Sequence, residues 1–398
     1  MNQLLKTIRF ENILSYSTSM TTLELDSLNV LIGANASGKS NLIEILSLLA
    51  ATPNNLLIPI REGGGVNDWL WKGNETAIAS IEASWFYPQL PNEPLHYQLS
   101  FTRSGNRFEL VDESITCHSL EIAEKSPLMY YAYQNGYPIL STLIDAQPPL
   151  RTQRQLQRRD VSIEQSILSQ RREADLYPEL TYLATQFSQI RFYREWNLGR
   201  YTAPRLPQKA DLPNDFLLED ASNLGLVINQ LQNNPQTKKQ LLTLLQEFYE
   251  YIEDITTKTE GNTIQVFFHE RGLQQPVPAT RLSDGTLRYL CLLTILCHPK
   301  PPPLICIEEP ELGLHPDILP TIAPLLQSCA ERTQLIVTTH SDVIVDALTD
   351  TPESIIVCEK AETGTQLKRL TKTELDIWLT EYSLGQLWRS GEIGGNRW

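Results

Sequence analysis

The chain has 398 residues, of which 41% are hydrophobic and 20% are charged. This is the composition of a soluble globular protein, long enough for two or three domains. The formal net charge of −14 argues against a globally basic nucleic-acid binder. Because the sequence has no run of about 18 apolar residues, we expect no membrane span and no membrane partner.

The cellular location follows from the N-terminal residues and the cysteines. The first residues have neither the apolar core nor the cleavage site of a secretory signal. The six cysteines form no C-x-x-C pair, and four of them lie in apolar runs. We therefore expect a cytoplasmic protein with reduced, buried thiols and no zinc site.

The N-terminal segment predicts two strands followed by a glycine-framed loop. Residues 4–10 and 21–32 read as strands, and the octapeptide Gly33–Ser40 follows the second. A helix pattern with Leu42, Ile45, Leu46 and Leu49 on one face comes next. This strand, loop and helix order matches the phosphate-binding pattern G-x-x-x-x-G-K-[ST].

The residue types of this loop suit a triphosphate. Glycines let the backbone turn tightly, so that its N–H groups and the helix N-terminus can point at phosphate oxygens. Lys39 can reach the β- and γ-phosphates, and the Ser40 hydroxyl can bind Mg²⁺. The alternative is a chance glycine-rich turn. The predicted ATP-binding residues are Gly33, Asn35, Ala36, Ser37, Gly38, Lys39, Ser40 and Asn41.

The middle of the chain predicts further strands and then helices. A turn-rich stretch at residues 135–149 is interpreted as a boundary. The expected strands cover residues 76–87, 95–103, 106–116 and 263–268, and the expected helices cover 151–171, 173–188, 223–252 and 284–297.

Three further motifs follow in the last third of the chain. Ser283 can cap the helix that starts at residue 284, and a free helix N-terminus with a hydroxyl can bind an anion. The apolar strand 304–307 ends in Glu308 and Glu309, which could hold a metal and activate a water molecule. A second buried strand leads to His340, which could contact a γ-phosphate. Taken singly, each motif also has a structural interpretation as a helix cap, a surface turn or a structural histidine.

The order of these four elements resembles the head of ABC ATPases, and more narrowly the RecF/SMC-like branch. The segments Ile8–Tyr16, Glu308–Pro316, Leu384–Trp388 and Gly394–Trp398 also resemble that group, which includes RecF-like ATPases labelled AAA-type and the ATPase part of OLD-family nucleases. The resemblance covers both ends of the chain, whereas residues 120–260 carry no matching motif. It implies an α/β fold, with an ABC-type P-loop NTPase head, a mixed β-sheet core and a helical insertion lobe.

By position, the resemblance assigns roles to the later motifs. It makes Ser283, Asp284 and Gly285 the signature segment, which in this family contacts the γ-phosphate bound by the opposite subunit. It makes Glu309 and His340 the catalytic residues, with His340 as the switch histidine, and it makes Ser40 and Glu308 the metal ligands. It also assigns the D-loop to residues 313–316.

The chain departs from the family pattern at three points. Glu308 stands where an aspartate is more usual, and Asp284 stands where many ABC proteins have another small residue. The glutamine of the Q-loop is not identified, although Gln186 and Gln189 are candidates by position.

The resemblance implies an ATP hydrolase that uses ATP and Mg²⁺ and forms an ATP-dependent, head-to-tail homodimer. In that arrangement ATP holds the interface together and hydrolysis releases it. We expect residues 1–140 and 256–398 to form the two parts of the ATPase core, and residues 141–255 to form the helical insertion.

The biological role is less constrained than the chemistry. DNA repair, genome maintenance and phage defence are the settings that the resemblance implies. The alternative is a regulatory ATP switch that controls a separate effector protein without binding DNA. A transporter ATPase is disfavoured, because residues 282–286 lack the transporter signature Leu-Ser-Gly-Gly-Gln.

A basic stretch between Arg151 and Lys209 has eleven Lys or Arg residues against six Asp or Glu residues. It could contact a DNA backbone, but a solvated helix face with internal salt bridges is slightly favoured, and a partner-protein surface is a third possibility. Arg151, Arg154 and Arg158 would share one face of a helix. The other arginines of the stretch are Arg159, Arg171, Arg172, Arg191, Arg194, Arg200 and Arg205.

Overall fold

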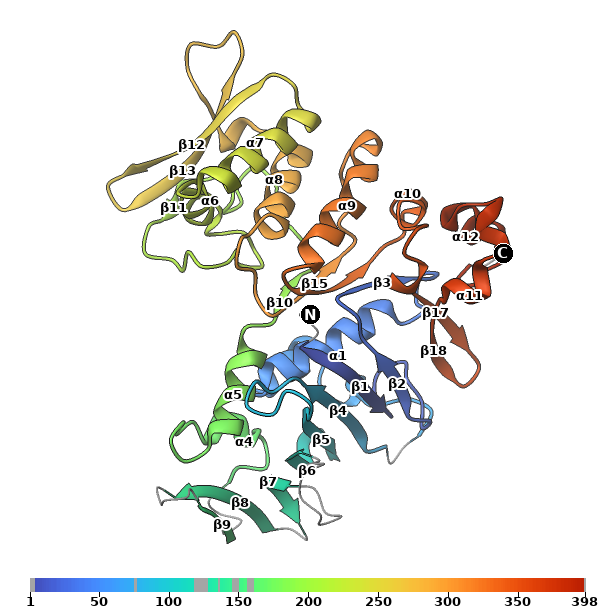
Figure 1. Cartoon of the computed structure of the whole chain (residues 1–398). Coiled ribbons are helices and arrows are strands. Elements are labelled where there is room, and N and C mark those ends of the chain that lie inside the picture. Colours follow the sequence, from blue (N-terminus) through green and yellow to red (C-terminus); the bar gives the residue numbers. More distant parts are fainter. Residues whose placement is uncertain are drawn as a thin grey trace. The chain divides into compact units, whose positions relative to one another are not determined.

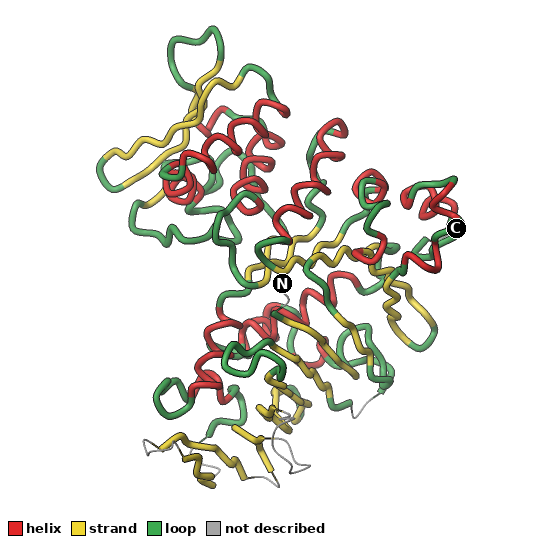
Figure 2. The backbone as a smooth tube through the Cα atoms, in the orientation of Figure 1, coloured by secondary structure: helices red, strands yellow, loops and turns green. Residues whose placement is uncertain are grey.

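The computed structural model describes residues 4–74, 77–117, 128–134, 137–144, 150–155 and 161–396 (Figures 1 and 2). By their contacts these residues form two compact units. The N-terminal unit contains the described residues up to Ile190, together with residues 356–370 and 393–396. The C-terminal unit contains residues 191–355 and 371–392.

The N-terminal unit contains an eight-stranded antiparallel sheet. Its order is β2-β1-β4-β5-β6-β7-β8-β9. Its strands are β1 (Leu5–Glu11), β2 (Thr21–Glu24), β4 (Ala79–Trp85), β5 (Leu95–Ser104), β6 (Arg107–Cys117), β7 (Leu128–Gln134), β8 (Tyr137–Ile144) and β9 (Leu150–Gln155).

The helix predicted over 151–171 is wrong at its start, because residues Leu150–Gln155 form β9. The turn-rich stretch 135–149 contains β8. The two strands pair antiparallel, with Ile139 opposite Gln155 and Leu143 opposite Arg151. Pairing with a neighbouring strand therefore decides the conformation here, which a local helical pattern cannot reveal.

Helices of the N-terminal unit pack on the sheet through aromatic side chains. Phe187 of α5 lies with its ring centroid 5.2 Å from Trp85 of β4 and 5.5 Å from Tyr97 of β5. All three side chains are fully buried, so they hold α5 against the sheet. The helices of this unit are α1 (Lys39–Ala51), α2 (Leu57–Glu62), α3 (Val66–Trp69), α4 (Ile167–Gln170) and α5 (Pro178–Ser188).

The strand that leads into the phosphate loop is β3 (Leu28–Ile32), and every residue in it is buried. It lies beside β17 (Ile355–Ala361), which pairs antiparallel with β18 (Gly364–Arg369). The Arg369 guanidinium donates to Asn29 Oδ1 at 2.7 Å, which fixes β18 to β3. A distant part of the chain therefore returns to support the strand before the loop.

A buried carboxyl group, Glu113 of β6, joins this sheet to α4. Tyr97 OH donates to Glu113 Oε1 at 2.7 Å, and the backbone N–H of Ile167 donates to Oε2 at 2.8 Å. The Ser166 hydroxyl, which caps α4, also donates to Oε1. Burial raises the pKa of Glu113 to about 7, although these hydrogen bonds favour the ionised form.

We expect this carboxyl group to make the stability of the N-terminal unit depend on pH. Because its folded pKa lies above the unfolded value of 4.5, the unfolded state loses the proton first, and the free energy of unfolding falls between about pH 4.5 and pH 7. The full difference is about 3 kcal/mol. Urea unfolding at pH 5 and pH 8 measures it, and Glu113→Gln should remove most of it.

Glu109→Gln, on the same strand but half-buried, is the matched control and should leave the pH dependence in place. An equal loss of stability between pH 5 and pH 8 in Glu113→Gln and in the native chain would show that another group titrates.

The C-terminal unit contains three parallel strands in the order β10-β15-β16. They are β10 (Arg191–Tyr193), β15 (Leu304–Glu308) and β16 (Gln334–Thr338). Apart from Glu308, all residues of β15 and β16 are buried, as expected for parallel strands. Helix α9 (Leu319–Ala330) connects β15 to β16, which are neighbours, so both strands end at the same edge.

A second small sheet in this unit carries two helices. Its order is β11-β13-β12, with β14 also paired to β13. The strands are β11 (Gln208–Lys209), β12 (Ile252–Glu260), β13 (Thr263–Glu270) and β14 (Val277–Pro278). Helices α6 (Leu224–Gln232) and α7 (Pro235–Phe248) pack on it.

The single helix predicted over 223–252 is wrong. It is broken between α6 and α7, because Asn234 caps α7 by accepting from Gln236 N, and Pro235 is at the first position of the helix.

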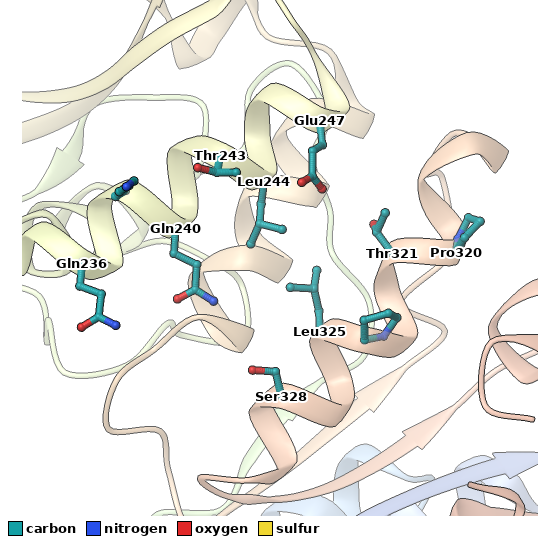
Figure 3. A pocket seen from close by; sticks show the side chains of 11 residues that line it. Gln236, Gln240, Thr243, Leu244, Glu247, Pro320, Thr321, Leu325 and Ser328 are labelled. Atoms are coloured by element: carbon teal, nitrogen blue, oxygen red, sulfur yellow. The ribbon is translucent and has the colours of Figure 1, made fainter. Parts of the chain in front are cut away.

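Helix α8 (Asp284–Leu296) is buried on all sides from Tyr289 onward and contacts α6, α7 and α9. A groove of about 770 Å³ lies between α7 and α9 (Figure 3). Figure 3 shows Gln240 and Leu244 of α7 facing Leu325 and Ser328 of α9. The remaining helices of this unit are α10 (Asp342–Asp346), α11 (Lys372–Leu375) and α12 (Leu384–Ser390).

The expected α/β class with sheets of both kinds is confirmed. The strands of the eight-stranded sheet pair antiparallel, whereas β10, β15 and β16 are parallel. The division at residues 140 and 255 stays a prediction. Within the described ranges, no helix is both long enough and apolar enough to cross a bilayer.

Candidate ATPase site

The phosphate loop has the backbone conformation that its glycines allow. Gly33 and Gly38 have φ angles of 154° and 104°, and Ala36 has a φ of 63°. Such angles are unfavourable for most residues, and a Cβ at Gly38 would also collide with Thr365 Oγ1. The expected turn between β3 and α1 is therefore present, and it requires glycine at position 38 on two grounds.

The ammonium group of Lys39 lies across this loop. Its Nζ donates to Gly33 O at 2.8 Å and to Ala34 O at 3.0 Å. The residue is only 6% exposed, so its positive charge is concentrated inside the loop. A charge held by backbone carbonyls attracts an incoming phosphate strongly, because little water surrounds it.

Three side chains from outside the octapeptide hold the loop in place. Thr365 Oγ1 lies 2.9 Å from Ser37 O and 2.7 Å from Ser15 Oγ, and Asn41 Nδ2 donates to the same Ser15 oxygen at 2.7 Å. Sequence reasoning missed Ser15 and Thr365, although Ser15 lies in a segment that resembles the family. The Asn41 amide, predicted to bind ATP, contacts Ser15.

The N-terminus of α1 fits an anionic ligand. In the described part of the chain no side chain caps this helix, and its first turn has no acidic residue. The Ser37 hydroxyl is buried, and among the described residues it has no hydrogen-bond partner. A helix N-terminus beside a buried hydroxyl and a lysine suits phosphate oxygens.

The two carboxylates at the end of β15 lie in different environments within the C-terminal unit. Glu308 Oε1 is 3.9 Å from Arg194 Nε, and its side chain is 19% exposed. Glu309 has a φ of 45°, and its N–H donates to Thr338 O at 2.9 Å. A non-glycine residue in this conformation is strained, which is characteristic of functional sites.

The structure brings Glu309 and His340 together. His340 Nε2 is 3.7 Å from Glu309 Oε1, and the side chains are 35% and 41% exposed. The two residues follow the adjacent parallel strands β15 and β16, so both side chains lie at one sheet edge and remain accessible to solvent.

Glu311 supports this pair and was missed by sequence reasoning. Its Oε1 accepts from Thr339 Oγ1 at 2.7 Å and from the backbone N–H of His340, also at 2.7 Å. Burial raises the pKa of Glu311. The side chain therefore fixes the backbone at His340. The signal for it in the sequence is weak, namely a third glutamate close to the other two.

The predicted signature segment opens α8 as expected. Ser283 Oγ accepts from Thr286 N at 3.0 Å, which caps the helix, while Ser283 and Asp284 are both exposed. Gly285 lies close to the D-loop region, since a Cβ there would be 3.2 Å from Gly313 O. The segments predicted to be the signature and the D-loop are therefore adjacent within this unit.

The basic stretch is more internally bonded than a DNA-contact surface would be. Arg205, counted there, is only 5% exposed and reaches Asp284, and Arg194 lies beside Glu308. Arg172 donates to Pro53 O. The helical spacing proposed for Arg151 and Arg154 does not apply, because both belong to β9, and Arg158 and Arg159 lie outside the described residues.

The two candidates for the Q-loop glutamine lie at the end of α5. Gln186 is in the helix and Gln189 follows its last turn, and the assignment of either one stays a prediction. All six cysteines are buried and free.

Comparison with known families decides the class of protein. Residues 28–346 match the family described as "AAA domain, putative AbiEii toxin, Type IV TA system". The chain belongs to this family. No curated protein matches its sequence.

The solved structures that match include SMC heads. They include an SMC head bound to the C-winged helix domain of ScpA, at 13% identity and a TM-score of 0.57, with 94% of this chain and 99% of that chain covered. A Pyrococcus furiosus SMC head with an extended coiled coil, bound to the C-terminal domain of ScpA, matches at 12% identity and 0.55, covering 95% and 99%. A Pyrococcus yayanosii SMC head with a coiled coil and joint matches at 11% and 0.51, covering 95% and 99%.

These likenesses confirm the fold. The family match and the SMC-head fold together identify an ATPase-type protein of the SMC/RecF-like ABC class, as the sequence motifs predicted. A nucleotide is the ligand that this class implies.

Proposed function

We propose that this protein hydrolyses ATP in sites shared between two copies of the chain. The observation that carries the proposal is the strained, accessible Glu309 with its carboxylate 3.7 Å from His340. A general base needs access to water and a fixed direction, and Glu309 has both.

In this proposal each residue of the site has its own role. Lys39 and the N–H groups of the loop would bind the β- and γ-phosphates, and the sequence resemblance assigns Ser40 and Glu308 as the residues that would hold Mg²⁺. The ion would neutralise charge on the phosphate oxygens. Glu309 accepts a proton from the attacking water, and His340 donates a hydrogen bond to a γ-phosphate oxygen.

The second copy supplies the signature segment. Ser283 and Asp284 are exposed at the N-terminus of α8, so they are available to another molecule. The N-terminus of a 13-residue helix, with a serine hydroxyl beside it, suits a γ-phosphate bound by the partner. Because ATP would contact both copies, it would stabilise the dimer by mass action.

Two cellular roles are open to such a dimer. DNA repair, genome maintenance or phage defence follows from the resemblance, whereas control of an effector protein needs no DNA contact. The internal bonds of Arg172, Arg194 and Arg205 favour the second role, because these cations already have partners. The ScpA-bound heads are consistent with it, since those proteins bind a protein partner.

An ATPase assay across protein concentration, with and without single- and double-stranded DNA, tests the proposal. A site shared between copies predicts that activity per molecule rises with concentration, and an effector-controlling switch predicts no stimulation by DNA at any salt concentration. Activity per molecule that stays constant from nanomolar to micromolar concentrations would contradict the shared site.

A further inference from the structure

A buried arginine lies beneath the first turn of α8. Arg205 comes from the irregular loop between β10 and β11, and its residue is 5% exposed. Its Nε donates to Leu198 O at 2.6 Å and its Nη1 donates to Leu282 O at 2.5 Å. Its Nη2 donates to Asp284 Oδ1. One guanidinium therefore joins its own loop to the residues on both sides of Ser283.

The contact to Leu282 and Asp284 is specific in direction. A planar guanidinium presents its donors in a fixed fork, so it holds a carbonyl and a carboxylate in set directions, whereas the three donors of a lysine all lie on one nitrogen. Nη1 also lies 3.4 Å from Ala279 O, at the start of the 3₁₀ turn before the helix. Ser283 thus lies between two residues whose positions Arg205 fixes.

The same loop is tied to α8 a second time. Arg288, in the second turn of α8, donates through Nη2 to Trp196 O at 3.3 Å, and its guanidinium lies 5.7 Å from the centre of the Trp196 ring. Arg205 itself is held in the loop by its N–H, which donates to Thr202 O at 3.1 Å. Arg205 and Arg288 therefore both connect this loop to α8.

The carboxylate of Asp284 explains why a positive charge is needed beneath the first turn of α8. Its side chain is 76% exposed and lies next to Ser283, where the proposed function places the partner's γ-phosphate. A free carboxylate at that place would repel a triphosphate. Asp284 also occupies the positive end of the helix, which would otherwise attract the anion.

We infer that Arg205 is a positioning residue for the signature segment: it aims Ser283 and neutralises Asp284, so that α8 of one copy can accept the triphosphate held by another. The inference rests on the proposed shared site. It adds a residue that lies far from the signature in sequence and has no place in the four motifs.

The test uses the Glu309→Gln background, in which the ATP-bound dimer should accumulate. Three changes are added to it: Arg205→Met, Arg205→Lys, and Arg205→Met combined with Asp284→Asn. Dimerisation with ATP is followed by light scattering, and ATP affinity of the dilute monomer by fluorescence. We expect Arg205→Met to weaken dimerisation at least tenfold and to change monomer ATP affinity less than twofold. Adding Asp284→Asn should recover at least threefold, because the unpaired carboxylate is then gone.

Arg271→Met is the matched control, since it removes an exposed arginine beside Glu253 on the same unit. It should leave dimerisation unchanged. If Arg205→Met melts below the assay temperature, Arg205→Lys serves instead, with an expected loss of at least threefold. Dimerisation within twofold of the background in the folded Arg205 variant, or no recovery in the double variant, overturns the inference. A background protein that fails to dimerise with ATP overturns the proposed function itself.

Discussion

Glu309→Gln is expected to lower the ATPase rate at least 100-fold while ATP still binds. The amide keeps the size of the side chain but cannot accept a proton from water, and general-base catalysis contributes about 10²- to 10⁴-fold. The backbone hydrogen bonds of Glu309 to Thr338 and Leu312 do not involve the side chain, so the fold should persist. Steady-state phosphate release measures the rate, and equilibrium binding of labelled ATP measures the affinity.

Two further variants sharpen this experiment. Glu309→Gly also removes the carboxylate, but it relieves the φ of 45° and should raise the free energy of unfolding by about 0.5–1 kcal/mol. Glu247→Gln, an exposed carboxylate in the groove of Figure 3, should leave the rate unchanged. A Glu309→Gln protein that retains a tenth or more of the native rate would assign the base to another residue.

Lys39→Met is expected to weaken ATP binding about 100-fold, or about 2.7 kcal/mol. Methionine keeps much of the apolar stem but removes the ammonium group, leaving Gly33 O and Ala34 O directed into the loop without their cation. These carbonyl dipoles would then repel the phosphates. Equilibrium binding of labelled ATP at low protein concentration measures the loss, and it should be greater for ATP than for ADP.

Lys72→Met is the control for this change, because Lys72 pairs with Asp68 on the surface of the same unit and both side chains are largely exposed. Its ATP affinity should match that of the native chain. If Lys39→Met bound ATP as tightly as this control, the octapeptide would be a structural turn, which is the alternative that its sequence leaves open.

Much of the candidate site could be predicted from the sequence because it depends on neighbouring residues. The loop between β3 and α1, the Ser283 cap and the carboxylates at the end of β15 each follow from a strand or helix boundary. The break at Asn234 could also be predicted from the sequence, because an asparagine before a proline signals the start of a helix. The apolar pattern of residues 223–252 obscured this signal.

The residues that sequence reasoning missed act over long distances along the chain. Arg205 is 79 positions from Asp284, and Thr365 is 350 positions from Ser15. No local pattern marks such partners, so an arginine counted as surface charge is instead buried under a helix. The strand β9 was missed for the same reason, because its conformation depends on β8.

The central claim is that two copies of the chain share each ATP. It is tested most directly by the molar mass of Glu309→Gln in solution, measured by light scattering with ATP and Mg²⁺ and again without nucleotide. The account predicts a monomer mass near 45.3 kDa without ATP and twice that mass with it. The same monomer mass in both conditions, in a protein shown to bind ATP, would contradict it.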